Sequence, residues 1–222
     1  MRISYKDILA TNEVFRHLNN LRRWTSFSAQ SKYNELSKQS LNCITAFILA
    51  SFAENEGKVV RWERFPKIAL YRAYQRAYVL YDTPGHTIDE ICKLGDIPRD
   101  VFDETTRQII TEKTEQVFAD FLASGSGTFE ESIYKAATKV ATLVELMEIS
   151  SAISPQSYLR KSQEISKALQ PYYATVPGLE YVADSNGQIF QVLQVISHLR
   201  NRTRRAAHSY IIECSVLGHL FD

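Results

Sequence analysis

Histidine and cysteine, the side chains that most often bind metals or act as nucleophiles, are few in this sequence and far apart. The five histidines are His17, His86, His198, His208 and His219, and the three cysteines are Cys43, Cys92 and Cys214. The cysteines form no CxxC pair, which is typical of reduced thiols in a cytoplasmic protein. No GxSxG, P-loop, HExxH or GxGxxG motif occurs. We therefore expect no catalytic residue and no complete metal site within the chain.

Arg22, Arg23 and Trp24 form the most suggestive ligand-binding group near the N-terminus. One interpretation is that the guanidinium groups hold a nucleotide phosphate while the indole ring stacks on the base. The alternative is a helix end with solvated arginines and a core tryptophan. These three side chains therefore make a nucleotide one candidate ligand of the chain.

A second basic group lies near the C-terminus and comprises Arg200, Arg202, Arg204 and Arg205. Such a group can bind phosphate or nucleic acid, but it more often forms a solvated face or pairs with acidic neighbours. The formal net charge of the chain is only +1. This balance argues against a protein built around a nucleic-acid surface.

The elements that would position these groups are predicted to be helices. Apolar residues make up 45% of the 222 positions and charged residues 23%, an ordinary globular mixture. Apolar side chains repeat with helical spacing in 36–54 (Leu41, Ile44, Ile48, Phe52) and 131–150 (Ile133, Ala137, Val140, Val144, Met147). No segment alternates with period two. The sequence therefore predicts an all-α fold of about nine or ten helices.

Proline and glycine divide the chain into segments. The stretch 171–187 holds two of each and has no helical period, so we expect a linker between a domain at 1–170 and a further helical segment at 188–222. The N-terminus has no signal peptide, and no apolar run is long enough to span a membrane. These features predict a soluble, cytoplasmic protein with no membrane partner.

A weak internal repeat links the two ends of the chain. Residues 15–24 and 196–205 share the pattern His-Leu-x-Asn followed by paired arginines. In each copy a short spacer leads into an apolar segment, at 35–42 and at 213–221. The repeat suggests that the C-terminal segment begins a second copy of the N-terminal fold.

Four segments between residues 12 and 150 keep a recognisable order and spacing. They are Arg23-Trp24, Ser37–Leu41, Lys67–Arg76 and Ala136–Lys139. Their layout resembles that of the HD-domain phosphohydrolases, in particular the 5′-deoxynucleotidase-like branch. In that family an Arg-Trp pair precedes a His segment, a His-Asp helix and a distant Asp, which together bind a divalent metal. The resemblance implies an HD-type helical bundle.

The chain departs from the family at every expected metal ligand. Gln39 replaces the first His, Gln75-Arg76 replaces the His-Asp pair, and Thr138 replaces the last Asp. Glutamine and threonine are neutral, weak oxygen donors, and arginine is a permanent cation. The resemblance therefore implies degenerate metal positions, and no cofactor is expected.

The surroundings of the Gln75-Arg76 pair also differ from the family. The acidic residue expected three or four positions later is replaced by Val79 and Leu80. Arg76 could take over the role of the metal and bind an anion. The favoured alternative is that Arg76 fills the vacated cavity and pairs with a carboxylate such as Asp82, because a buried cation needs a partner.

The C-terminal copy retains one ligand. His219, in Glu213–Leu220, resembles the first metal ligand of an intact HD domain, but the sequence ends three residues later at Asp222. The chain thus resembles the degenerate N-terminal half of a longer two-repeat HD protein. His219 would bind a metal only in a site completed by a missing segment.

Two functions follow from these observations. The first is a catalytically degenerate HD-like domain of a nucleotide phosphohydrolase-related protein, with a regulatory, scaffolding or dimerising role. Its partner would be another copy of the chain or a partner HD half. The alternative is a metal-dependent 5′-deoxynucleotide phosphohydrolase, using Mn, Co, Zn or Mg, whose site is completed by another chain or a missing segment. The sequence leans towards no enzymatic activity for this chain.

Overall fold

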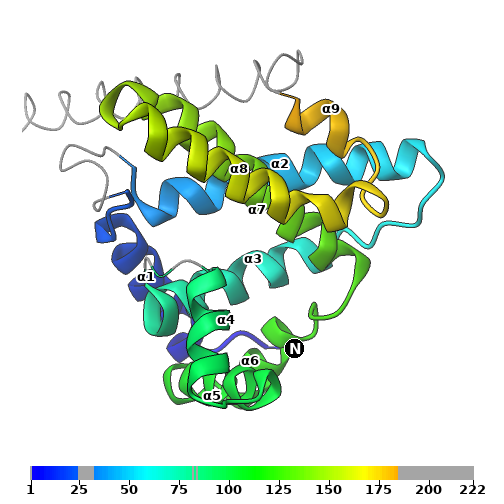
Figure 1. Ribbon diagram of the computed structural model, residues 1–222. Coiled ribbons are helices and arrows are strands. Elements are labelled where there is room, and N and C mark those ends of the chain that lie inside the picture. Colours follow the sequence, from blue (N-terminus) through cyan, green and yellow to red (C-terminus); the bar gives the residue numbers. More distant parts are fainter. Residues whose placement is uncertain (1, 25–32, 82, 84, 185–222) are drawn as a thin grey trace, which may run out of the picture. The chain divides into compact units, whose positions relative to one another are not determined.

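The computed structural model describes residues 2–24, 33–81, 83 and 85–184, and the regular elements in these ranges are helices (Figure 1). The α-helices are α1 (Tyr5–Asn20), α2 (Glu35–Asn55), α3 (Arg64–Gln75), α4 (Gly85–Leu94), α5 (Arg99–Lys113), α6 (Gln116–Ala123), α7 (Phe129–Glu148), α8 (Pro155–Tyr173) and α9 (Leu179–Ala183). A π-helical segment, η1 (Arg76–Leu80), continues α3, and a 3₁₀ turn, η2 (Ser150–Ala152), follows α7. The predicted all-α fold of about nine or ten helices is confirmed.

Short polar side chains start several of the helices. Each accepts a hydrogen bond from a backbone N–H of the first helical turn, and the four are Ser4, Asn34, Thr128 and Ser154. Such caps satisfy donors that have no partner inside the helix. At α1 the Asp7 side chain bonds back to the Ser4 backbone, completing a capping box. These bonds fix where α1, α2, α7 and α8 begin.

The longest helices, α2 and α7, make the most extensive contact between two elements, and α8 packs on α7. Along α7 the predicted face is correct at four of its five residues, because Ile133, Ala137, Val140 and Val144 are fully buried, whereas Met147 is partly buried. Along α2 the predicted face is wrong in part. Ile44, Ile48 and Phe52 are only partly buried, whereas polar side chains occupy the interior of the first half of this helix. The reason is a set of polar partners that α7 and the α1–α2 connection supply.

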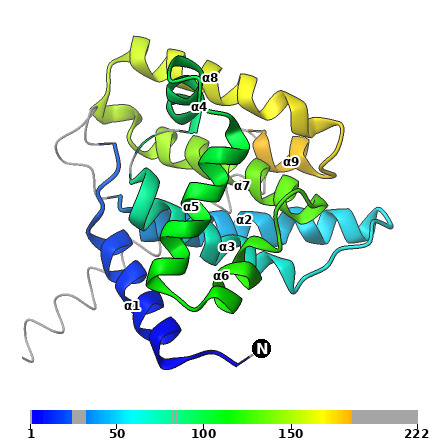
Figure 2. The same cartoon turned by 90° about the horizontal axis from the view of Figure 1, so that it is seen from below.

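Apart from the α2–α7 contact, a hydrophobic core lies where α1, α3, α5 and α6 meet (Figure 2). Its buried residues are Ala10, Val14, Leu18, Ala73, Tyr74, Ala77, Ile110, Phe118, Ala119 and Leu122. The α3 helix contacts α2 and α7 as well as this core. The α3 helix therefore links the α2–α7 pair to this core, and Arg76 follows directly after its last residue.

The chain divides into two compact units, residues 1–179 and 180–222. Within the stretch 171–187, which the sequence marks as a linker, residues 171–173 end α8 and residues 179–183 form α9. Residues 185–187 lie outside the described part. None of the described helices is long and apolar enough to cross a lipid bilayer.

Candidate functional site

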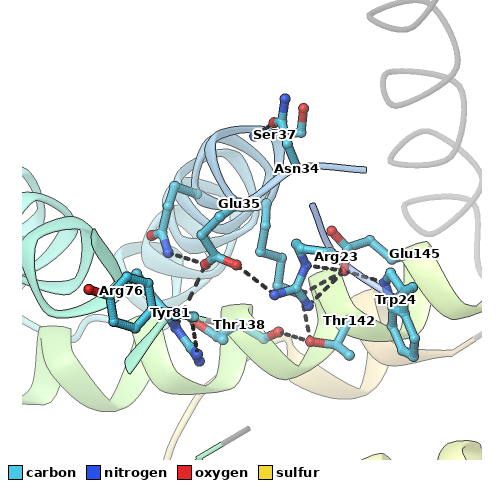
Figure 3. A network of polar contacts seen from close by, with 12 residues as sticks. Arg23, Trp24, Asn34, Glu35, Ser37, Arg76, Tyr81, Thr138, Thr142 and Glu145 are labelled. Carbon is cyan, nitrogen blue, oxygen red and sulfur yellow. Dashed lines mark hydrogen bonds and ion pairs between the residues drawn. The ribbon is translucent and has the colours of Figure 1, made fainter. Parts of the chain in front are cut away.

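A stripe of polar side chains is buried on the face of α2 that packs against α7. It consists of Glu35, Lys38, Gln39, Asn42 and Thr45, each of which exposes 9% or less of its surface. Residues three and four apart lie on one face of a helix, so the stripe is continuous. On α7 the buried polar residues Tyr134 and Glu145 contact it. Figure 3 shows the part of this network in which Glu35 and Glu145 meet Arg23, Trp24 and Arg76.

The Glu35 carboxylate is the first centre of this network. Its Oε2 accepts a hydrogen bond from Arg23 Nη1 at 2.6 Å, and its Oε1 accepts one from Gln39 Nε2 at 2.8 Å. Arg76 Nε lies 3.7 Å from the same Oε1. Tyr134 completes the arrangement by donating to Gln39 Oε1 at 3.0 Å. One buried carboxylate thus holds side chains from three separate segments.

The Glu145 carboxylate is the second centre. Its Oε2 accepts hydrogen bonds from Arg23 Nε at 3.2 Å and from Trp24 Nε1 at 3.1 Å, and it lies 3.6 Å from Lys38 Nζ. Burial alone would raise the pKa of Glu145, but the Arg23 and Lys38 charges and these hydrogen bonds lower it below its ordinary value. Glu145 is therefore a carboxylate anion near neutral pH.

Lys38 is an unusually buried ammonium group. Nζ donates to Thr142 Oγ1 at 2.5 Å, and only 3% of the side chain is exposed. Burial lowers the pKa of Lys38 from 10.5 to about 7, although the nearby Glu145 acts to raise it. The charges of Arg23 and Arg76 lower it further. Lys38 is thus partly neutral at physiological pH, which relieves the crowding of three cations around two carboxylates.

A tight backbone arrangement carries Arg23 and Trp24 into this network. Arg23 N donates to Tyr33 O at 2.9 Å, and Glu35 N donates to Leu21 O at 2.9 Å, so the backbone after α1 is paired with the backbone that leads into α2. Trp24 has a φ of 63°, in the left-handed region that a tryptophan rarely adopts. The indole ring is 8% exposed. Its contact with Glu145 holds the residue in this strained conformation.

Arg76 lies at the start of the π-helical segment and is tied to the loop that follows. Nη1 donates to Tyr81 O at 3.1 Å and to Thr83 O at 2.6 Å. Tyr81 has a φ of 46°, also in the left-handed region. A depression of about 240 Å³ opens beside this loop, and its lining includes His17, Asn20, Leu21, Ala77 and Tyr81. Strained backbone and π-helical turns both occur often at binding sites.

The four positions that the family resemblance marks as metal ligands do not form one group. Gln39 and Arg76 meet at Glu35. Gln75 instead accepts a hydrogen bond from Arg72 Nη1 at 2.9 Å, and Thr138 Oγ1 donates to the Tyr134 carbonyl of its own helix at 2.9 Å. The described carboxylate that pairs with Arg76 is Glu35, whereas Asp82 lies outside the described residues.

The predicted nucleotide-binding group is also divided. Arg22 is exposed, while Arg23 and Trp24 are bound to the buried carboxylates. His219 and the C-terminal arginines lie outside the described residues. Sequence reasoning missed Glu35, Lys38 and Glu145, which organise the network. The available signal was the run of polar residues at helical spacing in α2, a helix otherwise rich in apolar residues.

Comparisons with known proteins give no relative from which a role could be transferred. No family model, no curated protein and no solved structure matches the chain.

The buried ammonium group of Lys38 makes the stability of the fold depend on pH. Its folded-state pKa of about 7 lies below the value of 10.5 expected after unfolding, so between these values the folded state binds fewer protons. The free energy of unfolding should therefore rise as the pH increases from 7 towards 10, by at most about 1.4 kcal/mol per pH unit. Below pH 7 the cost of burying the charge is present in full.

Urea unfolding from pH 6.5 to 9.5 measures this effect, with Lys38→Met as the matched control. The difference between wild type and variant isolates Lys38 from the tyrosines and from Cys43, whose raised pKa acts in the opposite direction. Equal pH slopes for the two proteins would contradict the expectation.

Proposed function

We propose that this chain is a catalytically silent, HD-type helical domain with a regulatory, scaffolding or dimerising role in a nucleotide phosphohydrolase-related protein. One observation carries the proposal. Arg76 and Gln39, at two positions where the resemblance places metal ligands, both engage the Glu35 carboxylate. An ion pair and a hydrogen bond to one carboxylate, with no free metal donor at these two positions, support a structural role.

The side chains here do not fit a divalent cation. Such an ion requires several free carboxylate or imidazole donors. The Glu35 and Glu145 carboxylates are already bound by Arg23, and Lys38 and Arg76 add further positive charge. A metal would have to displace these cations and would be repelled by them. The proposal therefore assigns the cluster a structural role and derives no hydrolytic step from it.

Metal content and phosphate release test the proposal together. After incubation with Mn, Co, Zn or Mg and removal of free metal, we expect the purified chain to retain less than stoichiometric metal. We expect no phosphate release from a panel of deoxynucleoside monophosphates, with an authentic deoxynucleotidase as positive control. A stoichiometric metal that is lost on Glu35→Gln or Glu145→Gln substitution would overturn the proposal.

The sequence around His219 supports one alternative, a phosphohydrolase site completed by another chain or by a missing segment. The same assay separates the two functions. Metal-dependent phosphate release that His219→Ala abolishes, while the variant keeps its helical circular dichroism, would favour the alternative. Activity that survives this substitution would assign the metal to other residues.

A further inference from the structure

Two turns of basic residues face each other where α3 and α7 are in contact. Arg72 lies in the last turn of α3 and Arg76 begins η1, four positions later, while Lys135 and Lys139 are one turn apart on α7. In the first turn Glu131 lies 2.7 Å from Arg72 Nη2 and 3.3 Å from Lys135 Nζ. A carboxylate thus bridges the two cations of this turn.

In the second turn no such bridge is present among the described residues. Lys139 is only partly exposed, yet it has no hydrogen bond or ion pair with any of them. Burial and the neighbouring Arg76 charge lower its pKa. The Asp89 carboxylate acts in the opposite direction on this pKa, and it accepts a hydrogen bond from Arg99 Nη1 at 2.7 Å. Within the described part of the chain, Lys139 therefore holds a partly desolvated ammonium group close to the Arg76 charge, at a cost in stability.

We infer that the second turn binds a small oxoanion, phosphate or the phosphoryl group of a larger ligand, between Lys139 and Arg76. The anion would take the position that the Glu131 carboxylate occupies one turn earlier. Lys139 would supply an ammonium donor. Arg76 is held in place by the Tyr81 and Thr83 carbonyl groups at Nη1 and by Glu35 at Nε, so the anion would have to approach it from another side. The chain as a whole has a net charge of only +1, so this group of basic side chains is not simply the result of a basic composition. The site needs no metal.

Thermal unfolding in EDTA with inorganic phosphate, compared with chloride at the same ionic strength, tests this site. We expect phosphate to raise the melting temperature of the wild type by a few degrees at saturation. Lys139→Met should weaken phosphate binding at least tenfold. In phosphate-free buffer the same variant should melt at the same temperature as wild type or higher, because it loses like-charge repulsion. A lysine with a merely structural role would lower the melting temperature.

Two matched variants sharpen the result. Lys139→Arg keeps the charge and should retain phosphate binding. Lys161→Met removes a lysine that pairs with Glu164 on α8 and should leave phosphate binding unchanged. A deoxynucleoside 5′-monophosphate, compared with its nucleoside and with free phosphate, distinguishes a phosphate ester from the free ion as the better ligand.

Two outcomes would overturn the inference. One is a wild type that phosphate stabilises no more than chloride, and the other is an undiminished phosphate effect in Lys139→Met. Because EDTA is present throughout, either outcome leaves the proposed lack of metal-dependent hydrolysis untouched. Conversely, metal-dependent activity would overturn the proposed function without removing the phosphate site.

Discussion

Replacing Glu35 by glutamine is expected to lower the free energy of unfolding by about 3–5 kcal/mol, the usual cost of removing one partner from a buried ion pair. Glu35 is 1% exposed and is bound by Arg23 and by Gln39, with Arg76 nearby. Glutamine keeps the shape of the side chain but leaves the guanidinium groups of Arg23 and Arg76 without this counter-charge. The loss would be a large fraction of the 5–15 kcal/mol typical of a folded domain.

Urea unfolding at pH 7 measures this change. Glu104→Gln is the matched control, because Glu104 also pairs with an arginine, Arg107, but at the surface. This control should leave stability nearly unchanged. If Glu35→Gln were as mild as Glu104→Gln, the buried network would contribute little to the fold, and its proposed structural role would be wrong.

Glu145→Gln is expected to destabilise the fold by a similar amount, and Lys38→Met should partly rescue it. Without the Glu145 charge the buried ammonium group of Lys38 loses its nearest carboxylate, which lies 3.6 Å away. Methionine fills a similar volume and carries no charge. Replacing the Lys38 ammonium group by methionine, once the Glu145 charge is gone, removes an unpaired buried charge and therefore restores part of the lost stability.

A double-mutant cycle gives the size of the rescue. We expect an interaction energy of about 1–3 kcal/mol between Glu145→Gln and Lys38→Met. Leu159→Met, on the exposed side of α8, serves as a control that should be additive with Glu145→Gln. Additive effects of the Lys38 and Glu145 substitutions would show that the two groups do not interact in the folded protein.

The helical fold could be predicted because its signals are local. Apolar spacing identified α7 and most of its buried face. The buried face of α2 could not be found in the same way, because periodicity analysis assumes that interior residues are apolar. Here Gln39, Asn42 and Thr45 are inside.

The candidate site was predictable only in part. The family layout drew attention to Gln39, Arg76 and Arg23, which do converge on Glu35. The second carboxylate, Glu145, lies 122 positions from Arg23 along the chain. No local pattern indicates a contact over that distance, because it depends on how α2 and α7 pack. Lys139 ends the segment Ala136–Lys139 of that layout, but the layout gives it no role, and only the charges around it in the fold do so.

The π-helical turn after α3 has a consequence for anyone who aligns this sequence with others. Tyr81 N donates to Arg76 O at 2.9 Å, a bond that spans five residues where an α-helix spans four. The turn therefore accommodates one residue more than an α-helical turn. An ungapped alignment with a protein whose helix is α-helical throughout would be displaced by one position after Arg76. A correct alignment therefore needs a single-residue gap between Arg76 and Tyr81, and it shifts the register of Val79 and Leu80 by one position.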